Sequence, residues 1–94
     1  MNQSITLNVP TDLPSEDWEK IGAIYKTLDG WLDDPKCACW YGREGDPHYI
    51  WASVEPSGLL FEGVVEHRLW TGWISVLCAR LSFALGREIH DAEM

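Results

Sequence analysis

Residues 4–9 alternate between polar and apolar side chains. Ile5, Leu7 and Val9 are each separated by one polar residue, and a period of two is typical of a strand with one buried face. Pro10 and Pro14 follow, and proline cannot donate the backbone hydrogen bond that a strand interior requires. The pattern therefore predicts a first strand that ends before Pro10.

The next segment has the helical period of three to four residues. Its apolar residues are Trp18, Ile21, Ile24, Tyr25, Leu28, Trp31 and Leu32. Ser15 precedes them as a candidate N-cap, and Glu16 and Asp17 fall where the helix dipole favours negative charge. The pattern predicts a helix that begins at Ser15 and ends either at Gly30 or one turn later, at residues 33–35.

Three short segments follow, near residues 37–42, 48–54 and 59–65, and we expect each to be a strand. They are joined by GREGDP, a loop by composition, and by EPSG, whose proline and glycine are typical of a tight turn. Strands with such short connections pair as an antiparallel meander.

A second, longer helix is predicted from Glu66 to Leu85. One side of it carries Trp70, Trp73, Ile74, Leu77, Leu81 and Leu85. Gly86 is the candidate residue that ends this helix. Residues 87–90 are a candidate short edge strand.

The expected order of elements is thus β-α-β-β-β-α, with or without a final short strand. This order predicts an α+β fold of two layers, in which both helices cover one face of an antiparallel sheet. A chain of 94 residues has no room for a second core, so residues 1–94 are expected to form a single domain. Trp18, Trp31, Trp70 and Trp73 fall on the helical stripes and are predicted to lie in the core.

Strand parity predicts which side chains share a face of the sheet. If EPSG is the turn, the facing pairs are Val54–Leu59, Ala52–Phe61 and Ile50–Gly63. All of these residues are apolar or small, so this face is predicted to be the core. If GREGDP is the other loop, Tyr41 pairs with His48. Cys39 then pairs with Ile50, so Cys37 and Cys39 are expected to point into the core.

The opposite face of this sheet holds large aromatic residues that no helix would cover. Its predicted members are Trp40, Tyr49, Trp51, Ser53, Leu60, Glu62 and Val64. An exposed apolar patch of this kind commonly marks an interface, so these residues, except Ser53, form the candidate partner-binding site. Acidic residues of the adjoining loops extend the site: Asp33, Asp34, Glu44 and Asp46.

The charge balance indicates the kind of partner. The chain has 15 acidic and seven basic side chains, which give a formal net charge of −8. Such a chain repels phosphate, which argues against nucleic acid as a direct ligand. The same charge attracts a basic protein.

The sequence also indicates a compartment. No segment has the length and apolar character of a membrane span, and the N-terminus lacks the basic and apolar regions of a signal peptide. The three cysteines are odd in number, which suits a reducing environment better than a disulfide framework. We therefore expect a cytoplasmic protein that does not associate with membranes.

The reactive residue types do not form a recognisable catalytic or metal-binding motif. Zinc would need two soft ligands besides Cys37 and Cys39, and thiol redox chemistry usually uses a C-x-x-C motif. Glu66 and His67 are neighbours, but no nucleophile can be placed beside them. We therefore expect structural cysteines, no metal and no cofactor, and we do not expect an enzyme.

The chain resembles the small acidic cytoplasmic immunity proteins of bacterial toxin systems. The resemblance lies in its size, acidity and tryptophan content, in the order β-α-β-β-β-α, and in the stretches WASVEPSGLL and LSFALGREIHDAE. It implies inhibition of a toxin through tight binding, and it assigns a role to no particular residue. Two other hypotheses stay open. One is a structural homo-oligomer, such as a homodimer, that pairs its aromatic sheet faces. The other is a small enzyme or ligand-binding protein with a pocket between sheet and helices.

Overall fold

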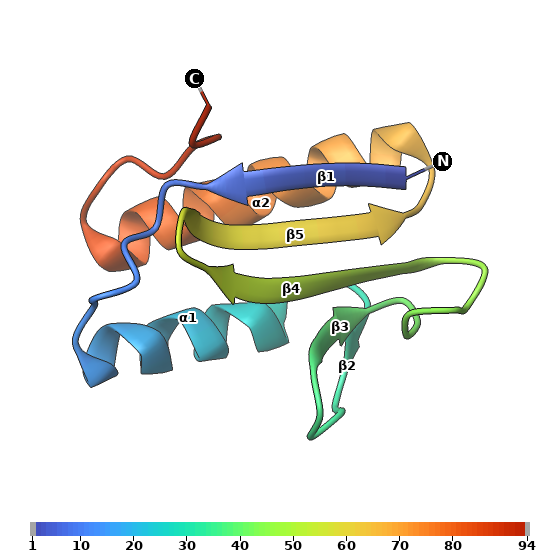
Figure 1. The fold of residues 1–94 in the computed structure, drawn as a ribbon, viewed down its shortest axis with the longest axis horizontal. Coiled ribbons are helices and arrows are strands. Elements are labelled where there is room, and N and C mark those ends of the chain that lie inside the picture. The colour runs from blue at the N-terminus through green and yellow to red at the C-terminus, as the bar shows by residue number, and fades with distance from the viewer. Residues whose placement is uncertain (1, 94) are drawn as a thin grey trace.

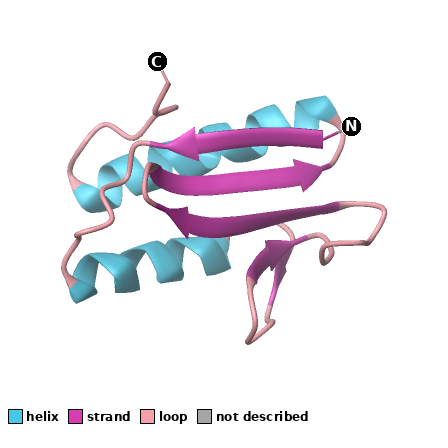
Figure 2. Cartoon of the chain, in the orientation of Figure 1, coloured by secondary structure: helices cyan, strands magenta, loops and turns pink. Residues whose placement is uncertain are grey.

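An antiparallel sheet and two helices make up the part of the chain, residues 2–93, that the computed structural model describes (Figure 1, Figure 2). The strands are β1 (Asn2–Leu7), β2 (Trp31–Leu32), β3 (Ala38–Trp40), β4 (Tyr49–Glu55) and β5 (Gly58–Val64), and the helices are α1 (Ser15–Thr27) and α2 (His67–Leu85). The order is β-α-β-β-β-β-α. It confirms the expected α+β fold and adds one short strand, β2.

The five strands form one sheet in the order β1-β5-β4-β3-β2, and every neighbouring pair is antiparallel. The β2–β3 hairpin projects from one edge of this sheet, and the C-terminal segment runs beside β1 at the other edge (Figure 1). There the Ala92 amide donates to the Thr6 carbonyl at 2.7 Å, and Leu7 forms an isolated bridge with Asp91. The edge strand expected at residues 87–90 is thus replaced by a one-residue bridge just beyond them.

The tight turn between β4 and β5 gives the register that its sequence predicts. All three expected pairs are present: Val54–Leu59, Ala52–Phe61 and Ile50–Gly63. Glycine is required at position 63, because an added Cβ would lie 2.6 Å from the Tyr49 carbonyl oxygen and 2.9 Å from Cγ1 of Ile50. Val54, at the end of this face, was predicted to be buried but is exposed.

Both helices pack on the same face of the sheet, and α2 lies behind the sheet in Figure 1. The core between the layers includes Ile21 of α1, the residues Trp70, Trp73, Ile74, Leu77 and Leu81 of α2, and the strand residues Leu7, Trp40, Ile50, Leu59 and Phe61. Trp18 and Trp31 are partly buried and pack against this cluster. The expected core placement is therefore confirmed for Trp70 and Trp73, whereas Trp18 and Trp31 lie at the margin of the core.

Helix α2 ends where the sequence predicts and begins one residue later, at His67, with Glu66 as its N-cap. The Glu66 side chain caps its first turn by accepting a hydrogen bond from the Arg68 amide, and Gly86 ends it in a left-handed conformation with φ of 67°. Among residues 2–93, neither helix combines the length and the apolar character needed to cross a bilayer.

Helix α1 is shorter than expected, because it ends at Thr27, where Leu28 is already extended with ψ of 145°, and the chain then turns at Gly30. Gly30 has φ of +87°, and the ring of Tyr41 lies 2.6 Å from the position that a Cβ would take. Trp31 and Leu32, which fit the helical period, therefore leave the helix and form β2. The contact with Tyr41 joins residues distant in the sequence, which the local pattern does not reveal.

The register between β3 and β4 differs by one residue from the prediction. Trp40 pairs with Ile50 and Cys39 pairs with Trp51. Trp40 therefore lies on the core face with no exposed surface, and its predicted placement on the open face is wrong. The loop begins at Tyr41, whose φ of 69° ends the strand, so the assumed pairing of Tyr41 with His48 is also wrong.

The burial of Trp40 explains why this register is favoured. Its ring packs against the rings of Tyr25, Trp31, Phe61 and Trp73, with centroids 4.8 to 6.2 Å away. Its Nε1 donates to the Tyr25 carbonyl at 3.0 Å, so the polar group is satisfied. A buried tryptophan removes roughly 150–250 Å² of surface from water. In the predicted register the smaller Cys39 would take this core position and would bury less apolar surface.

Candidate functional site on the open face of the sheet

The face of the sheet opposite the helices carries the main candidate site. Because side chains alternate along a strand, Tyr49 and Trp51 of β4 share this face with Leu60, Glu62 and Val64 of β5. Tyr49 is paired with Val64, and Trp51 with Glu62. All five residues are partly exposed. The fold thus brings together five of the six strand residues predicted for the site, and only Trp40 is lost from it.

A hollow of about 240 Å³ opens on this face, and we call it the acidic hollow. It is lined by Asn2, Gln3, Ser4, Glu44, Tyr49, Trp51, Glu62 and Gly63. Glu62 comes from β5 and Glu44 from the loop between β3 and β4. The ion pairs formed within residues 2–93 are Lys20–Asp17 and Arg43–Asp34, so neither carboxylate of the hollow is paired with a basic side chain of the described residues.

The acidic hollow has the chemistry to receive a cationic side chain. The carboxylates of Glu44 and Glu62 are acceptors for a guanidinium or ammonium group. The ring faces of Tyr49 and Trp51 attract a cation placed over them. Ser4 adds a hydroxyl group that can accept a further hydrogen bond. Arginine, whose flat group both stacks on rings and donates to carboxylates, suits these walls best.

Two of the acidic loop residues predicted for the site are free to contribute to a negative surface. Glu44 lines the acidic hollow, and Asp33 is exposed in the loop between β2 and β3. Both carboxylates therefore carry negative charge that no ion pair of the described residues neutralises.

The other two acidic loop residues order the loops instead. Asp34 accepts hydrogen bonds from the Lys36 amide at 2.9 Å and from Nε of Arg43 at 2.6 Å. The Lys36 amide, followed by the Arg43 side chain, holds the pKa of Asp34 below its ordinary value. Asp46 accepts a hydrogen bond from the Arg43 amide at 2.7 Å. These bonds commit Asp34 and Asp46 to the loops, so their predicted part in partner contact has no support in the geometry.

The two cysteines of the β2–β3 hairpin do not point toward the helices. Cys37 is exposed, and Cys39 is buried on the side of the sheet that carries Trp51. Their predicted position in the core is therefore wrong, because of the same one-residue shift that buries Trp40. Burial, followed by a hydrogen bond with Cys37, raises the pKa of the Cys39 thiol to about 11.

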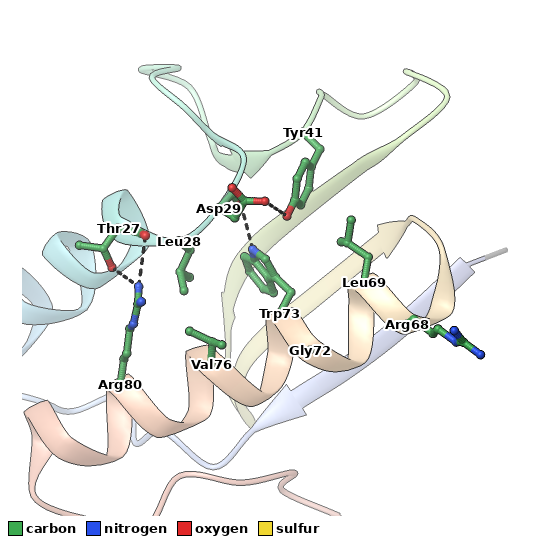
Figure 3. Close-up of a pocket in the computed structure, with 10 residues that line it drawn as sticks. All are labelled: Thr27, Leu28, Asp29, Tyr41, Arg68, Leu69, Gly72, Trp73, Val76 and Arg80. Atoms are coloured by element: carbon green, nitrogen blue, oxygen red, sulfur yellow. Dashed lines mark hydrogen bonds between the residues drawn. The ribbon is translucent and has the colours of Figure 1, made fainter.

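A second hollow, of about 430 Å³, lies between α2, the end of α1 and the β2–β3 hairpin (Figure 3). Its polar groups are largely bonded to one another. The Tyr41 hydroxyl donates to Oδ2 of Asp29 at 2.8 Å, and Nε1 of Trp73 donates to the Asp29 carbonyl at 3.1 Å. Arg80 donates to the carbonyl and hydroxyl of Thr27 at 3.1 and 2.9 Å. Few polar groups therefore remain here to orient a small substrate.

An exposed apolar stripe on α2, which we call the helix stripe, was not identified from the sequence. It consists of Leu69, Val76 and Phe83, seven residues apart, and Phe83 is 92% exposed. The small residues Gly72 and Ala79 lie between them along the helix. The seven-residue spacing is present in the sequence, but the buried tryptophans and leucines of the same helix dominate its pattern.

Comparison of the chain with models of protein families, with curated proteins and with solved structures found no match.

Proposed function

We propose that this protein is a cytoplasmic protein-binding inhibitor of the immunity type, which neutralises a basic toxin domain through the open face of its sheet. The observation that carries the proposal is the acidic hollow, in which two carboxylates without basic partners among residues 2–93 lie beside exposed parts of two aromatic rings. Such a hollow suits an arginine or lysine that projects from a basic surface.

The surroundings of the hollow favour a protein as the ligand. Leu60 and Val64 continue the same face as partly exposed apolar residues, and Asp33 adds charge at the adjoining hairpin. An apolar patch with a polar rim is the usual anatomy of a protein interface. The net charge of −8 speeds encounter with a basic partner.

Binding to the acidic face would inhibit a basic toxin if the toxin's Lys and Arg side chains lie at its active site. A toxin that acts on nucleic acid or another anionic substrate needs exposed Lys and Arg at its active site. An acidic face that engages those side chains competes with the substrate for the same charges. No chemistry by the inhibitor itself is required.

Capture from the native host tests this proposal. The immobilised wild-type protein is expected to retain a basic protein that arrests growth when produced alone, and co-production of the inhibitor should restore growth. Trp51→Ala and Glu62→Gln should lose both capture and protection, whereas Phe83→Ser, on the opposite layer, should keep both. Protection that survives Trp51→Ala and Glu62→Gln would contradict the proposal.

Self-association is a second candidate function, and the helix stripe favours it. Leu69, Val76 and Phe83 expose apolar surface along one line of α2, and an exposed stripe of this spacing can pair with a second helix. The homo-oligomer would then form through α2 and not through the aromatic sheet face that the sequence suggests. Light scattering separates the candidates, because a dimer that Phe83→Ser converts to a monomer supports self-association through α2.

A further inference from the structure

The loop of the β2–β3 hairpin folds back so that three metal-binding side chains meet. Asp34 lies in this loop, Cys37 precedes β3, and Cys39 lies within β3. The carboxylate oxygen of Asp34 and the two sulfur atoms all lie within 4.8 Å of one another. Ligand atoms around a tetrahedral zinc ion, bound at about 2.0–2.3 Å, are about 3.3–3.8 Å apart. Small side-chain movements would therefore close these three donors around an ion.

We propose that Asp34, Cys37 and Cys39 bind a thiophilic divalent cation of the zinc type, with water in the fourth position. Two thiolates and a carboxylate are a donor set that zinc accepts, and hard cations such as Mg²⁺ and Ca²⁺ do not use sulfur ligands. This site is independent of the acidic hollow. It also revises the expectation of no metal, because the sequence alone supplies only the two cysteines as ligands.

The charges of the site balance when the ion binds. Each cysteine releases its thiol proton to solvent as its sulfur bonds to the metal, so binding of one M²⁺ releases two protons. Two thiolates and one carboxylate bring a charge of −3, and the ion reduces it to −1. The guanidinium of Arg43, whose Nε lies 2.6 Å from Oδ2 of Asp34, offsets the remaining charge.

Hydrogen bonds outside the ligand set hold Asp34 in place for this role. Oδ1 accepts from the Lys36 amide at 2.9 Å and Oδ2 from Arg43. Partners of this kind commonly orient the carboxylate ligands of metal sites. The Asp34 side chain is only 12% exposed, whereas Cys37 is exposed and gives an ion its path from solvent.

The bound ion would tie the loop at residues 33–37 to β3. The hairpin has few backbone hydrogen bonds of its own to hold it, because β2 has two residues and β3 has three. An ion that binds the folded chain and not the unfolded chain stabilises the fold in proportion to the logarithm of its concentration over its Kd.

Titration of the reduced, metal-free full-length protein with Co²⁺ and then with Zn²⁺ tests the site. Co²⁺ should bind with one equivalent, release two protons and give the near-ultraviolet sulfur-to-cobalt absorption, and Zn²⁺ should then displace it without further proton release. Zn²⁺ should also raise the thermal midpoint. Because Cys39 is buried, the exposed Cys37 is the ligand to change, and Cys37→Ser should weaken Co²⁺ binding at least tenfold and lower the sulfur absorption.

Matched variants show whether these three residues are the site. Asp34→Asn should also weaken binding at least tenfold, whereas Asp33→Asn and Cys78→Ser should bind as the wild type does. Absence of the sulfur-to-cobalt absorption in the folded wild-type protein would overturn the proposal. Equal Co²⁺ affinity of Cys37→Ser and Cys78→Ser would overturn it as well.

Discussion

At the scale of single residues, close contacts in the centre of the sheet decide how the strands pair. The backbone of β5 at Gly63 passes so near to β4 that a Cβ would lie 2.6 Å from the Tyr49 carbonyl and 2.9 Å from Cγ1 of Ile50. In helix α1, by contrast, nothing lies within 4 Å of the Cβ position of Gly22. Substitution by alanine should therefore have opposite effects on the free energy of unfolding at the two glycines.

Gly63→Ala should lower the free energy of unfolding by about 1–3 kcal/mol, because the methyl group overpacks a rigid site. Gly22→Ala should raise it by about 0.5–1 kcal/mol, because alanine loses less backbone entropy in a helix. Urea unfolding of both variants measures the difference. A Gly63→Ala protein as stable as the wild type would show that the register of β4 and β5 is wrong.

The sequence predicts the contact at Gly63 but not the burial of Trp40. The short EPSG turn leaves one sensible register, so Ile50 and Gly63 could be paired from the residues alone. The longer loop from Tyr41 to His48 does not specify whether its flanking strands shift by one residue. There the outcome depends on the cluster of rings around Trp40, which comes from several elements.

Tyr25 should make the protein less stable at alkaline pH. Burial raises the pKa of its hydroxyl above the ordinary tyrosine value, which is about 10. Above about pH 10 the unfolded chain loses this proton while the folded chain keeps it. The free energy of unfolding is therefore unaffected by Tyr25 below that pH and falls as the pH rises above it.

The variant Tyr25→Phe isolates this effect, because phenylalanine keeps the ring that packs edge-on against Trp40 at 5.1 Å and Phe61 at 5.9 Å. The fall in unfolding free energy above about pH 10 should be smaller in Tyr25→Phe than in the wild type, by up to about 1.4 kcal/mol per pH unit. Urea unfolding at neutral and alkaline pH measures it. Parallel pH profiles of the two proteins would contradict a buried Tyr25 hydroxyl.

At the scale of elements, those that the sequence predicts well have local signals, and those that it misses depend on distant contacts. Helix α2 has Glu66 before it and Gly86 after it, and both act as its caps. At the end of α1 the local signals conflict, since Gly30 favours an end there while Trp31 and Leu32 keep the helical spacing although they form β2. The hairpin that they begin is also the part of the sheet with the shortest strands.

The β2–β3 hairpin should open more readily than the rest of the sheet. Its strands have two and three residues and β2 is the edge strand, whereas β4 and β5 have seven residues each and pair over their whole length. Few backbone hydrogen bonds and an edge position lower the free energy of local opening. Hydrogen exchange followed by mass spectrometry should therefore show faster exchange in peptides from residues 31–40 than from residues 58–64. Equal protection would contradict this view of the hairpin.

At the scale of the whole molecule, two different surfaces lie on opposite layers. The acidic hollow is on the open face of the sheet, and the helix stripe is on α2, behind the sheet in Figure 1. Residues 67–85 contain basic residues but no Asp or Glu. The two surfaces should therefore respond differently to salt.

Association with a basic partner should slow as salt is added, because salt screens the attraction between opposite charges. Any self-association through the helix stripe should persist at high salt, because burial of apolar surface is not screened. Stopped-flow association rates and light scattering over one salt series measure the two effects. A partner association rate that is independent of salt would contradict the role assigned to the carboxylates.

The affinity of the captured partner for the wild type and for single variants of the open face shows directly whether this face binds the partner. Glu62→Gln removes a charge and keeps the shape of the hollow. Trp51→Ala removes an aromatic ring, and loss of such a ring at the centre of an interface commonly costs about 2 kcal/mol or more of binding free energy. Titration calorimetry should give a Kd at least tenfold weaker for each variant, with unchanged affinity for Phe83→Ser. An unchanged Kd for Glu62→Gln and Trp51→Ala, with loss of binding in Phe83→Ser, would contradict the account and place the interface on α2.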